Sequence, residues 1–148
     1  MSWLTILLGA VLFGMVLTGC GTSPGGIAID GARIGQPTGP HAALYLTATS
    51  EGEPDRLVAA STDVAAGVEI HQTTTEDGVM SMQRTDGLDL RAGESLMLEP
   101  GGLHLMLLDV ARLDVGAVIE VTLIWETAGE MTVEAEVVDP AETMSHDW

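Results

Sequence analysis

The sequence predicts an all-β fold, an antiparallel β-sandwich, from two observations. From Ile27 onward, apolar and polar residues alternate with a period of two, which is typical of strands that bury one face. Residues that favour turns interrupt these runs at 51–55, 86–87, 92–93 and 99–102, at spacings typical of a sandwich. The sequence shows no amphipathic helix of ordinary length.

Three runs carry the alternation most clearly. Residues 43–49 form one predicted strand, and residues 118–126 and 131–138 flank the predicted turn 127–130 to form a hairpin. Side chains of one parity along each run should point into the core. These are Leu44, Leu46, Ala48, Ile119, Val121, Leu123, Trp125, Met131, Val133, Ala135 and Val137.

The N-terminal residues have the pattern of a targeting segment. Residues 2–19 carry no charged side chain, and their apolar run is short for a membrane span but suits a signal peptide. The run ends in Leu17-Thr18-Gly19-Cys20, which resembles the lipobox of bacterial lipoproteins. We therefore expect a signal peptide at 1–19, a lipid on Cys20, a flexible tether over 20–26, and a protein anchored to a bacterial membrane on its extracytoplasmic side.

Charge and cysteine content exclude several functions. The chain has 22 acidic residues and five basic ones, all arginines, for a net charge of -17. Nucleic acid is not an expected partner, because phosphate binding needs a basic surface. If Cys20 is lipidated, no thiol remains for a disulfide, a nucleophile or a copper-thiolate centre. No Ser-His-Asp or paired-carboxylate pattern stands out, so we expect no enzymatic activity.

Two histidines and two methionines have a distinctive spacing. Ten residues separate His71 from Met82, 21 separate Met82 from His104, and one separates His104 from Met106. Taken alone, each methionine would more often fill the core and each histidine would more often be a surface residue. In the run 103–107, however, His104 and Met106 share one face of a strand, and the three leucines share the other. Taken together, the four residues predict a metal site.

The H-x10-M-x21-H-x-M spacing resembles the metal motif of the PCuAC family of periplasmic copper chaperones. Residues 41–73 and 91–110 also resemble this family. The resemblance implies a cupredoxin-like Greek-key β-sandwich over residues 27–140. It also implies Cu(I) bound by two histidines and two methionines, here His71, Met82, His104 and Met106. The expected acceptor is the copper-centre subunit of cytochrome c oxidase, for assembly of its binuclear centre, or another copper-relay protein.

The chemistry of the ligand set agrees with copper. Thioethers are soft, uncharged donors that suit Cu(I), whereas zinc sites draw on cysteine, histidine and carboxylate, and calcium sites on oxygen. Four neutral ligands would favour Cu(I) over Cu(II). Copper storage or resistance would use the same site without a dedicated acceptor, and a metal-free envelope lipoprotein with a structural role remains a further alternative.

Other histidines and methionines fit the pattern less well. Met80 shares a strand face with Met82 and is either an alternative thioether or a packing residue. Met144 and His146 lie in a predicted flexible tail, 141–148, and are candidate auxiliary ligands. Met97 fits no ligand spacing and is expected to pack in the core.

Overall fold

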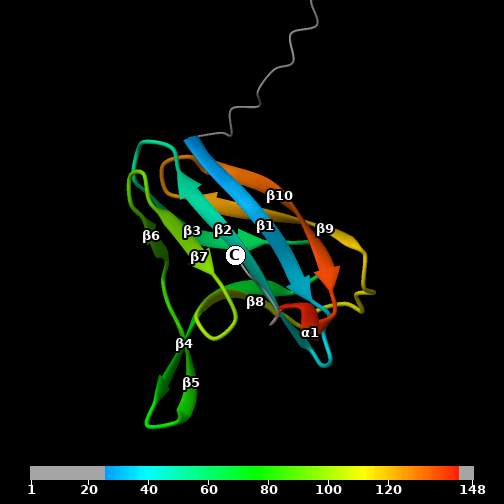
Figure 1. Cartoon of the computed structure of the whole chain (residues 1–148). Coiled ribbons are helices and arrows are strands. Elements are labelled where there is room, and N and C mark those ends of the chain that lie inside the picture. The colour runs from blue at the N-terminus through cyan, green and yellow to red at the C-terminus, as the bar shows by residue number, and fades with distance from the viewer. Residues whose placement is uncertain (1–25, 144–148) are drawn as a thin grey trace, which may run out of the picture.

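The computed structural model describes residues 26–143 and is almost entirely β (Figure 1). Cys20, Met144 and His146 lie outside the described residues. The strands are β1 (Ile27–Gly35), β2 (His41–Ser50), β3 (Asp55–Ser61), β4 (Gly67–Glu76), β5 (Val79–Arg84), β6 (Leu88–Leu90), β7 (Ser95–Leu98), β8 (Leu103–Leu108), β9 (Val118–Trp125) and β10 (Gly129–Val138), and α1 (Pro140–Thr143) comes after β10. The predicted all-β sandwich is confirmed.

The strands hydrogen bond in the order β5-β4-β8-β2-β1-β10-β9-β3-β6, and β7 also pairs with β2. Strands that are neighbours in space are therefore often distant in sequence, as in a Greek key. Every pairing is antiparallel except that of β1 with β10, which is parallel. The period of two predicts strands, but it does not predict the directions in which they pair.

The core is built from the predicted side of each strand. Leu44, Leu46 and Ala48 on β2 are fully buried, and Leu105 and Leu107 on β8 pack into the same cluster. Alternate residues of β9 and β10 complete it, as the predicted hairpin requires: Val121, Leu123, Trp125, Met131, Ala135 and Val137 are buried. Because these strands each bury one face, the opposite faces are free to carry other chemistry.

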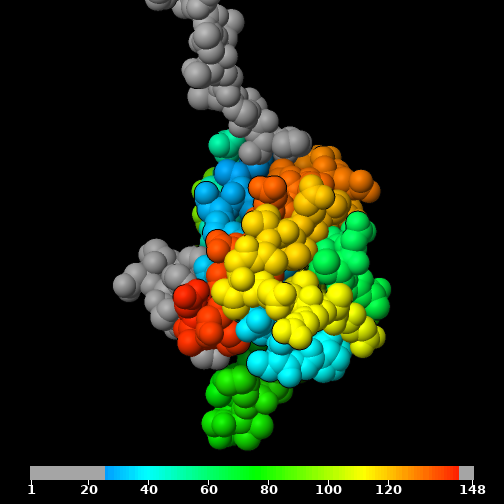
Figure 2. Space-filling view, turned by 90° about the vertical axis from the view of Figure 1, so that its right-hand side faces the viewer, coloured from blue at the N-terminus to red at the C-terminus, as the bar shows by residue number. Residues whose placement is uncertain are grey.

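The β4–β5 hairpin projects from the body of the molecule, at the end opposite the start of β1 (Figure 1). Figure 2 shows the same projection from the side, in green. Its loop is Asp77-Gly78, and both residues have positive φ, 51° and 78°. This is the geometry of a two-residue type I′ turn, for which Asp-Gly is a favoured sequence. All six residues of β5 are exposed, and β5 forms an edge of the sheet.

Asp55, at the start of β3, holds the β9–β10 turn. Its carboxylate accepts hydrogen bonds from the backbone N–H groups of Thr127 (2.9 Å) and Ala128 (2.8 Å). A third comes from the N–H of Arg56. Burial by itself would raise the pKa of Asp55, but the hydrogen bonds together hold that pKa below its ordinary value.

Two expectations differ from the structure. Residues 141–143, predicted to begin the flexible tail, belong to α1, and Thr143 is buried. Asp139 caps this turn by accepting a hydrogen bond from the N–H of Ala141 (2.8 Å), and Pro140 takes the first helical position, which it favours. The prediction that Met97 packs in the core is wrong: it is 49% exposed, because Leu98 takes the inward position of β7.

Within residues 26–143, no helix is long and apolar enough to cross a membrane.

Candidate metal centre

His71 and His104 lie directly opposite each other on the antiparallel strands β4 and β8. Their rings meet edge to face, with centroids 5.7 Å apart. The two residues are 33 positions apart in sequence, and the β4–β8 pairing alone brings them together. Both lie on the sheet face opposite the core side chains Ile70 and Leu105, which are their chain neighbours, although His104 is itself buried.

The two candidate thioethers flank this histidine pair on the same face of the sheet. Met106 is two residues from His104 on β8 and lies opposite Glu69. Met82 on β5 lies opposite Thr73, which is two residues from His71. Residues two apart on a strand share a face, and diagonal neighbours on adjacent strands are roughly 7–8 Å apart, within reach of a long side chain. The register therefore makes His104 a direct neighbour of His71, and Met82 and Met106 its diagonal neighbours from opposite sides of β4.

Exposure rises across the site from β8 to β5. His104 is buried, His71 and Met106 are partly buried, and Met82 is 56% exposed. The site is thus anchored in the sheet on one side and open to solvent at the projecting hairpin.

His104 has a defined free nitrogen. Its Nδ1 lies 3.3 Å from the carbonyl oxygen of Gly102. A carbonyl only accepts hydrogen bonds, so Nδ1 carries the proton, and the lone pair of the neutral ring is on Nε2. Burial lowers the pKa of His104 and the nearby His71 adds to this, while the Gly102 hydrogen bond opposes it. The net lowering favours the neutral ring that a metal requires.

In His71, the other ring nitrogen, Nε2, makes the hydrogen bond. Its Nε2 lies 2.9 Å from Oε2 of Glu69, and an ionised carboxylate only accepts, so Nε2 carries the proton. Among the described residues, 26–143, Nδ1 of His71 is buried and has no hydrogen-bond partner. A buried nitrogen lone pair without a partner is costly unless a ligand uses it. This atom is the strongest feature of the structure that fits a bound cation.

Glu69 also pairs with Arg84, which lies opposite His71 on β5. Nη1 of Arg84 is 2.9 Å from Oε1 of Glu69, so both carboxylate oxygens are engaged. The hydrogen bond from His71 is the main cause that lowers the pKa of Glu69, with further lowering from the Arg84 charge, while desolvation opposes both. Glu69 is therefore a carboxylate held in its ionised form beside the candidate ligands.

Tyr45 borders the site on the β2 side. Its ring centroid is 6.4 Å from that of His104, and the guanidinium of Arg33 lies 6.0 Å from the Tyr45 ring centroid. Burial raises the pKa of Tyr45, and the Arg33 charge acts in the opposite direction. The tyrosine ring covers His104 from the side away from β4, which helps to explain the burial of that histidine.

Of the further candidates, only Met80 can be placed. Met80 is on β5, opposite Thr75 of β4. It shares a face with Met82, lies two residues nearer the hairpin tip, and is exposed. Of the two roles predicted for Met80, packing is the less favoured, because an exposed side chain at a sheet edge has little to pack against. Within residues 26–143, no three His, Cys, Asp or Glu side chains are arranged to hold a metal ion.

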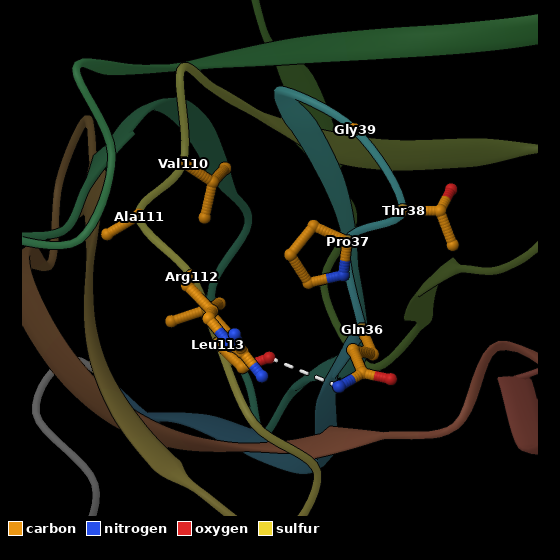
Figure 3. Close-up of a pocket in the computed structure, with 8 residues that line it drawn as sticks. All are labelled: Gln36, Pro37, Thr38, Gly39, Val110, Ala111, Arg112 and Leu113. Atoms are coloured by element: carbon orange, nitrogen blue, oxygen red, sulfur yellow. Dashed lines mark hydrogen bonds between the residues drawn. The ribbon is translucent and has the colours of Figure 1, made fainter.

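A separate pocket lies away from these residues. It has a volume of about 520 Å³ and is lined by two loop segments, 36–39 and 110–113 (Figure 3). The side-chain amide of Gln36 donates a hydrogen bond to the carbonyl of Leu113 (3.3 Å) and links the two segments. None of the four candidate ligands lines this pocket.

The sequence analysis did not single out Glu69, Arg84 or Tyr45. The position of Glu69 two residues before a candidate ligand in a strand was an available signal. Asp77-Gly78 was another, because this dipeptide fixes the hairpin register and so places Arg84 opposite His71. The contact of Tyr45 with His104 depends on the crossover that pairs β2 with β8, which no local pattern reveals.

Comparison with known proteins finds a matching family model and two relatives. A family model described as "Putative lipoprotein LpqE-like" matches residues 27–137. The putative lipoprotein Lxx21020 of Leifsonia xyli subsp. xyli is 35% identical over 85 residues, which cover 56% of this chain and 51% of the relative. The uncharacterized protein RP573 of Rickettsia prowazekii is 29% identical over 102 residues, covering 67% of this chain and 56% of the relative. The chain thus spans about half the length of these curated relatives.

Solved structures with the same fold include copper-bound domains. The copper-bound PCuAC domain from PmoF2 matches with a TM-score of 0.68 and 29% identity, over 80% of this chain and 97% of that domain. The Cu(I) form of DR1885 from Deinococcus radiodurans matches with a TM-score of 0.59 and 30% identity, over 74% of this chain and 76% of that one. These similarities support the cupredoxin-like sandwich that the sequence resemblance implies.

Proposed function

Since the chain belongs to the LpqE-like family of putative lipoproteins, we propose that it is an extracytoplasmic copper chaperone, anchored to the membrane by a lipid on Cys20. It holds Cu(I) through two imidazole nitrogens and two thioether sulfurs. The ligands are His71, Met82, His104 and Met106.

The observation that carries this proposal is the gathering of four neutral donors on one sheet face, with the buried Nδ1 of His71 among them. A soft, uncharged ligand set favours a soft, singly charged cation, and Cu(I) is the biological metal that fits. The copper-bound PmoF2 domain and the Cu(I) form of DR1885 support the same metal for this fold. Nδ1 of His71 and Nε2 of His104 are the nitrogens available to it.

Graded exposure across the ligand set suits transfer rather than burial of the metal. Met82 is the most exposed of the four and sits on a projecting edge hairpin. An acceptor can therefore replace Met82 first, while His104 still holds the ion from the sheet. We propose that the acceptor is the copper-centre subunit of cytochrome c oxidase or another copper-relay protein.

A competitive titration tests the copper site. The full chain, purified in mild detergent, is titrated with Cu(I) against a chromogenic chelator under reducing, anaerobic conditions. We expect one tightly bound equivalent, lost in the double variant Met82→Leu/Met106→Leu. Met97→Leu is the matched control, because it removes a methionine that is also exposed but lies on β7, outside the site. Binding by the double variant as tight as that of wild type would refute the ligand assignment.

Storage or resistance would use the same four ligands as delivery, and these functions differ only in whether the protein passes its copper to an acceptor. Mixing the Cu(I)-loaded chain with a copper-free soluble domain of the oxidase subunit separates them. Delivery predicts that copper moves to the acceptor within the mixing experiment, whereas storage predicts that it stays on the chain.

A further inference from the structure

We propose that Arg84 and Glu69 set the metal selectivity of this site by keeping a carboxylate out of the ligand set. The inference rests on the proposed function, since it concerns the same four ligands. The carboxylate of Glu69 lies where it could become a fifth metal ligand. Its hydrogen bonds with Arg84 and His71 occupy both oxygens and prevent this.

Glu69 lies within the ligand group by register. It is two residues before His71 on β4, on the same face, and directly opposite Met106 on β8. A carboxylate at this position is within reach of a cation held by the neighbouring side chains. The Glu69 side chain is only 27% exposed, so it lies against the sheet face rather than extending into solvent.

Both oxygens of Glu69 are already engaged. Oε2 accepts from Nε2 of His71 at 2.9 Å, and Oε1 accepts from Nη1 of Arg84 at 2.9 Å. The His71 contact fixes the ring and directs its lone pair to Nδ1, as carboxylates commonly do behind metal-binding histidines. The Arg84 contact acts from β5, at the outer margin of the site, and gives the carboxylate a cationic partner other than the metal.

The chemistry of the two possible ligand sets differs in charge. With Glu69 held back, the donors are two imidazoles and two thioethers, all neutral, and they favour Cu(I). As folded, no three His, Cys, Asp or Glu side chains within residues 26–143 are arranged to hold a metal ion. Release of Glu69 would let its carboxylate turn toward His71 and His104, and two histidines with one glutamate are a ligand set found in zinc enzymes. An anionic oxygen would raise the affinity for Zn(II) and other divalent ions, which compete with Cu(I) outside the cell. Arg84 therefore acts as a specificity determinant without touching the metal.

The experiment compares divalent and monovalent binding in variants of the full chain in detergent. Arg84→Met removes the charge and keeps most of the side-chain length, Arg84→Lys keeps the charge, and Arg84→Met/Glu69→Gln removes the carboxylate as well. Arg91→Met is the matched control, because it deletes an exposed arginine whose ion pair is with Glu94 rather than Glu69. Zn(II) affinity is measured by competition with a chromogenic zinc chelator, and Cu(I) affinity is measured in parallel.

We expect Arg84→Met to bind Zn(II) about tenfold more tightly than wild type, at the lower end of the range for changes behind metal ligands because Arg84 is 67% exposed. Arg84→Lys and Arg91→Met should resemble wild type, and the double variant should lose the gain. A gain of equal size in Arg91→Met would show that net charge alone is responsible and would overturn the inference. Unchanged Zn(II) affinity in Arg84→Met, or a gain that survives in the double variant, would also overturn it.

The two proposals fail in different ways. If wild type binds Cu(I) stoichiometrically and Arg84→Met gains no Zn(II) affinity, the copper site stands and the selectivity role is wrong. If wild type binds no Cu(I), the proposed function is wrong, whatever the zinc result.

Discussion

His71 and His104 face each other across β4 and β8 with ring centroids 5.7 Å apart, yet they hydrogen bond through opposite ring nitrogens. His71 donates from Nε2 to Glu69, and His104 donates from Nδ1 to the Gly102 carbonyl. The pair therefore presents one δ and one ε nitrogen lone pair. This asymmetry arises from the partners, because one is a side chain on the same strand and the other is the backbone carbonyl of Gly102, just before β8.

The first prediction concerns the tautomers of this histidine pair. In the metal-free protein at neutral pH, the ¹⁵N shifts and two-bond ¹H–¹⁵N couplings of histidine-labelled samples should identify the Nε2–H tautomer for His71 and the Nδ1–H tautomer for His104. Exposed histidines favour Nε2–H, so the His104 result is the discriminating one. An Nε2–H tautomer at His104 would show that the Gly102 hydrogen bond does not form. His41, an exposed histidine at the start of β2, provides the reference spectrum.

The second prediction concerns stability linked to copper. A ligand that binds only the folded state stabilises it by about 2.7 kcal/mol when its free concentration is 100 times Kd. For a domain of this size, that raises Tm by roughly 10 °C. Cu(I), buffered by a chelator, should produce this rise in wild type and in Met97→Leu but not in Met82→Leu/Met106→Leu. A metal-free structural lipoprotein would show no rise in any of them, so calorimetry under anaerobic conditions separates the two functions.

The third prediction concerns Asp55. Its folded-state pKa is lowered, so its contribution to stability is present above the unfolded pKa of about 3.9 and is lost as pH falls through the folded value. Asp55→Ala should cost about 1–3 kcal/mol at pH 7, because the N–H groups of the β9–β10 turn lose their acceptor. The difference from wild type should shrink by pH 2. Denaturant unfolding at both pH values measures it.

The control for Asp55 is an acidic residue with a different environment. Asp114 is 77% exposed and forms an ion pair with an exposed arginine, Arg112, at 3.4 Å. Asp114→Ala should therefore change the free energy of unfolding by no more than about 0.5 kcal/mol at either pH. Equal effects of the two substitutions would show that the Asp55 hydrogen bonds contribute no special stability.

Local patterns predicted the strands and the core but not how the strands meet. The alternation in β2, β9 and β10 results directly from burial of one face, so the core-facing side of these strands was predicted correctly, although Ile119 and Val133 are only partly buried. The parallel β1–β10 pairing and the β2–β8 crossover join segments that are distant in sequence. Such pairings depend on how all the strands share one core, and a period of two carries no information about them.

The candidate ligands were predicted from their spacing, and the register shows how that spacing puts them on one face of the sheet. His104 and Met106 share a face because they are two apart on one strand. The Asp77-Gly78 turn fixes the pairing of β4 with β5, so the interval from His71 to Met82 sets their diagonal relation. The partners Glu69 and Arg84 have no fixed interval that marks them as a pair, and only the folded hairpin brings them together.

The fourth prediction concerns the membrane anchor. If Cys20 carries a lipid, labelled palmitate should be incorporated into the wild-type protein and should be absent from Cys20→Ser. The wild-type protein should fractionate with membranes, because stable anchoring requires acyl chains. A Thr22→Ser variant, two residues further on, controls for changes near the cleavage site and should behave as wild type. Membrane association of Cys20→Ser equal to wild type would exclude lipidation as the anchor.

The fifth prediction separates the projecting hairpin from the core. Gly78 has a φ of 78°, where a residue with a Cβ is strained by roughly 1–2 kcal/mol, although no atom lies within 4 Å of an added Cβ. Gly78→Ala should therefore disturb the β4–β5 turn and the position of Met82 without filling any space. Because β5 is exposed along its whole length, the strain should be relieved by loosening of the hairpin rather than by global unfolding. We expect a several-fold loss of Cu(I) affinity with a Tm within about 2 °C of wild type.

Gly39→Ala is the matched control, since Gly39 also has open space around it but no positive φ, and both measurements should match wild type. A Gly78→Ala protein with unchanged Cu(I) affinity would indicate that Met82 does not depend on the hairpin turn for its place in the site.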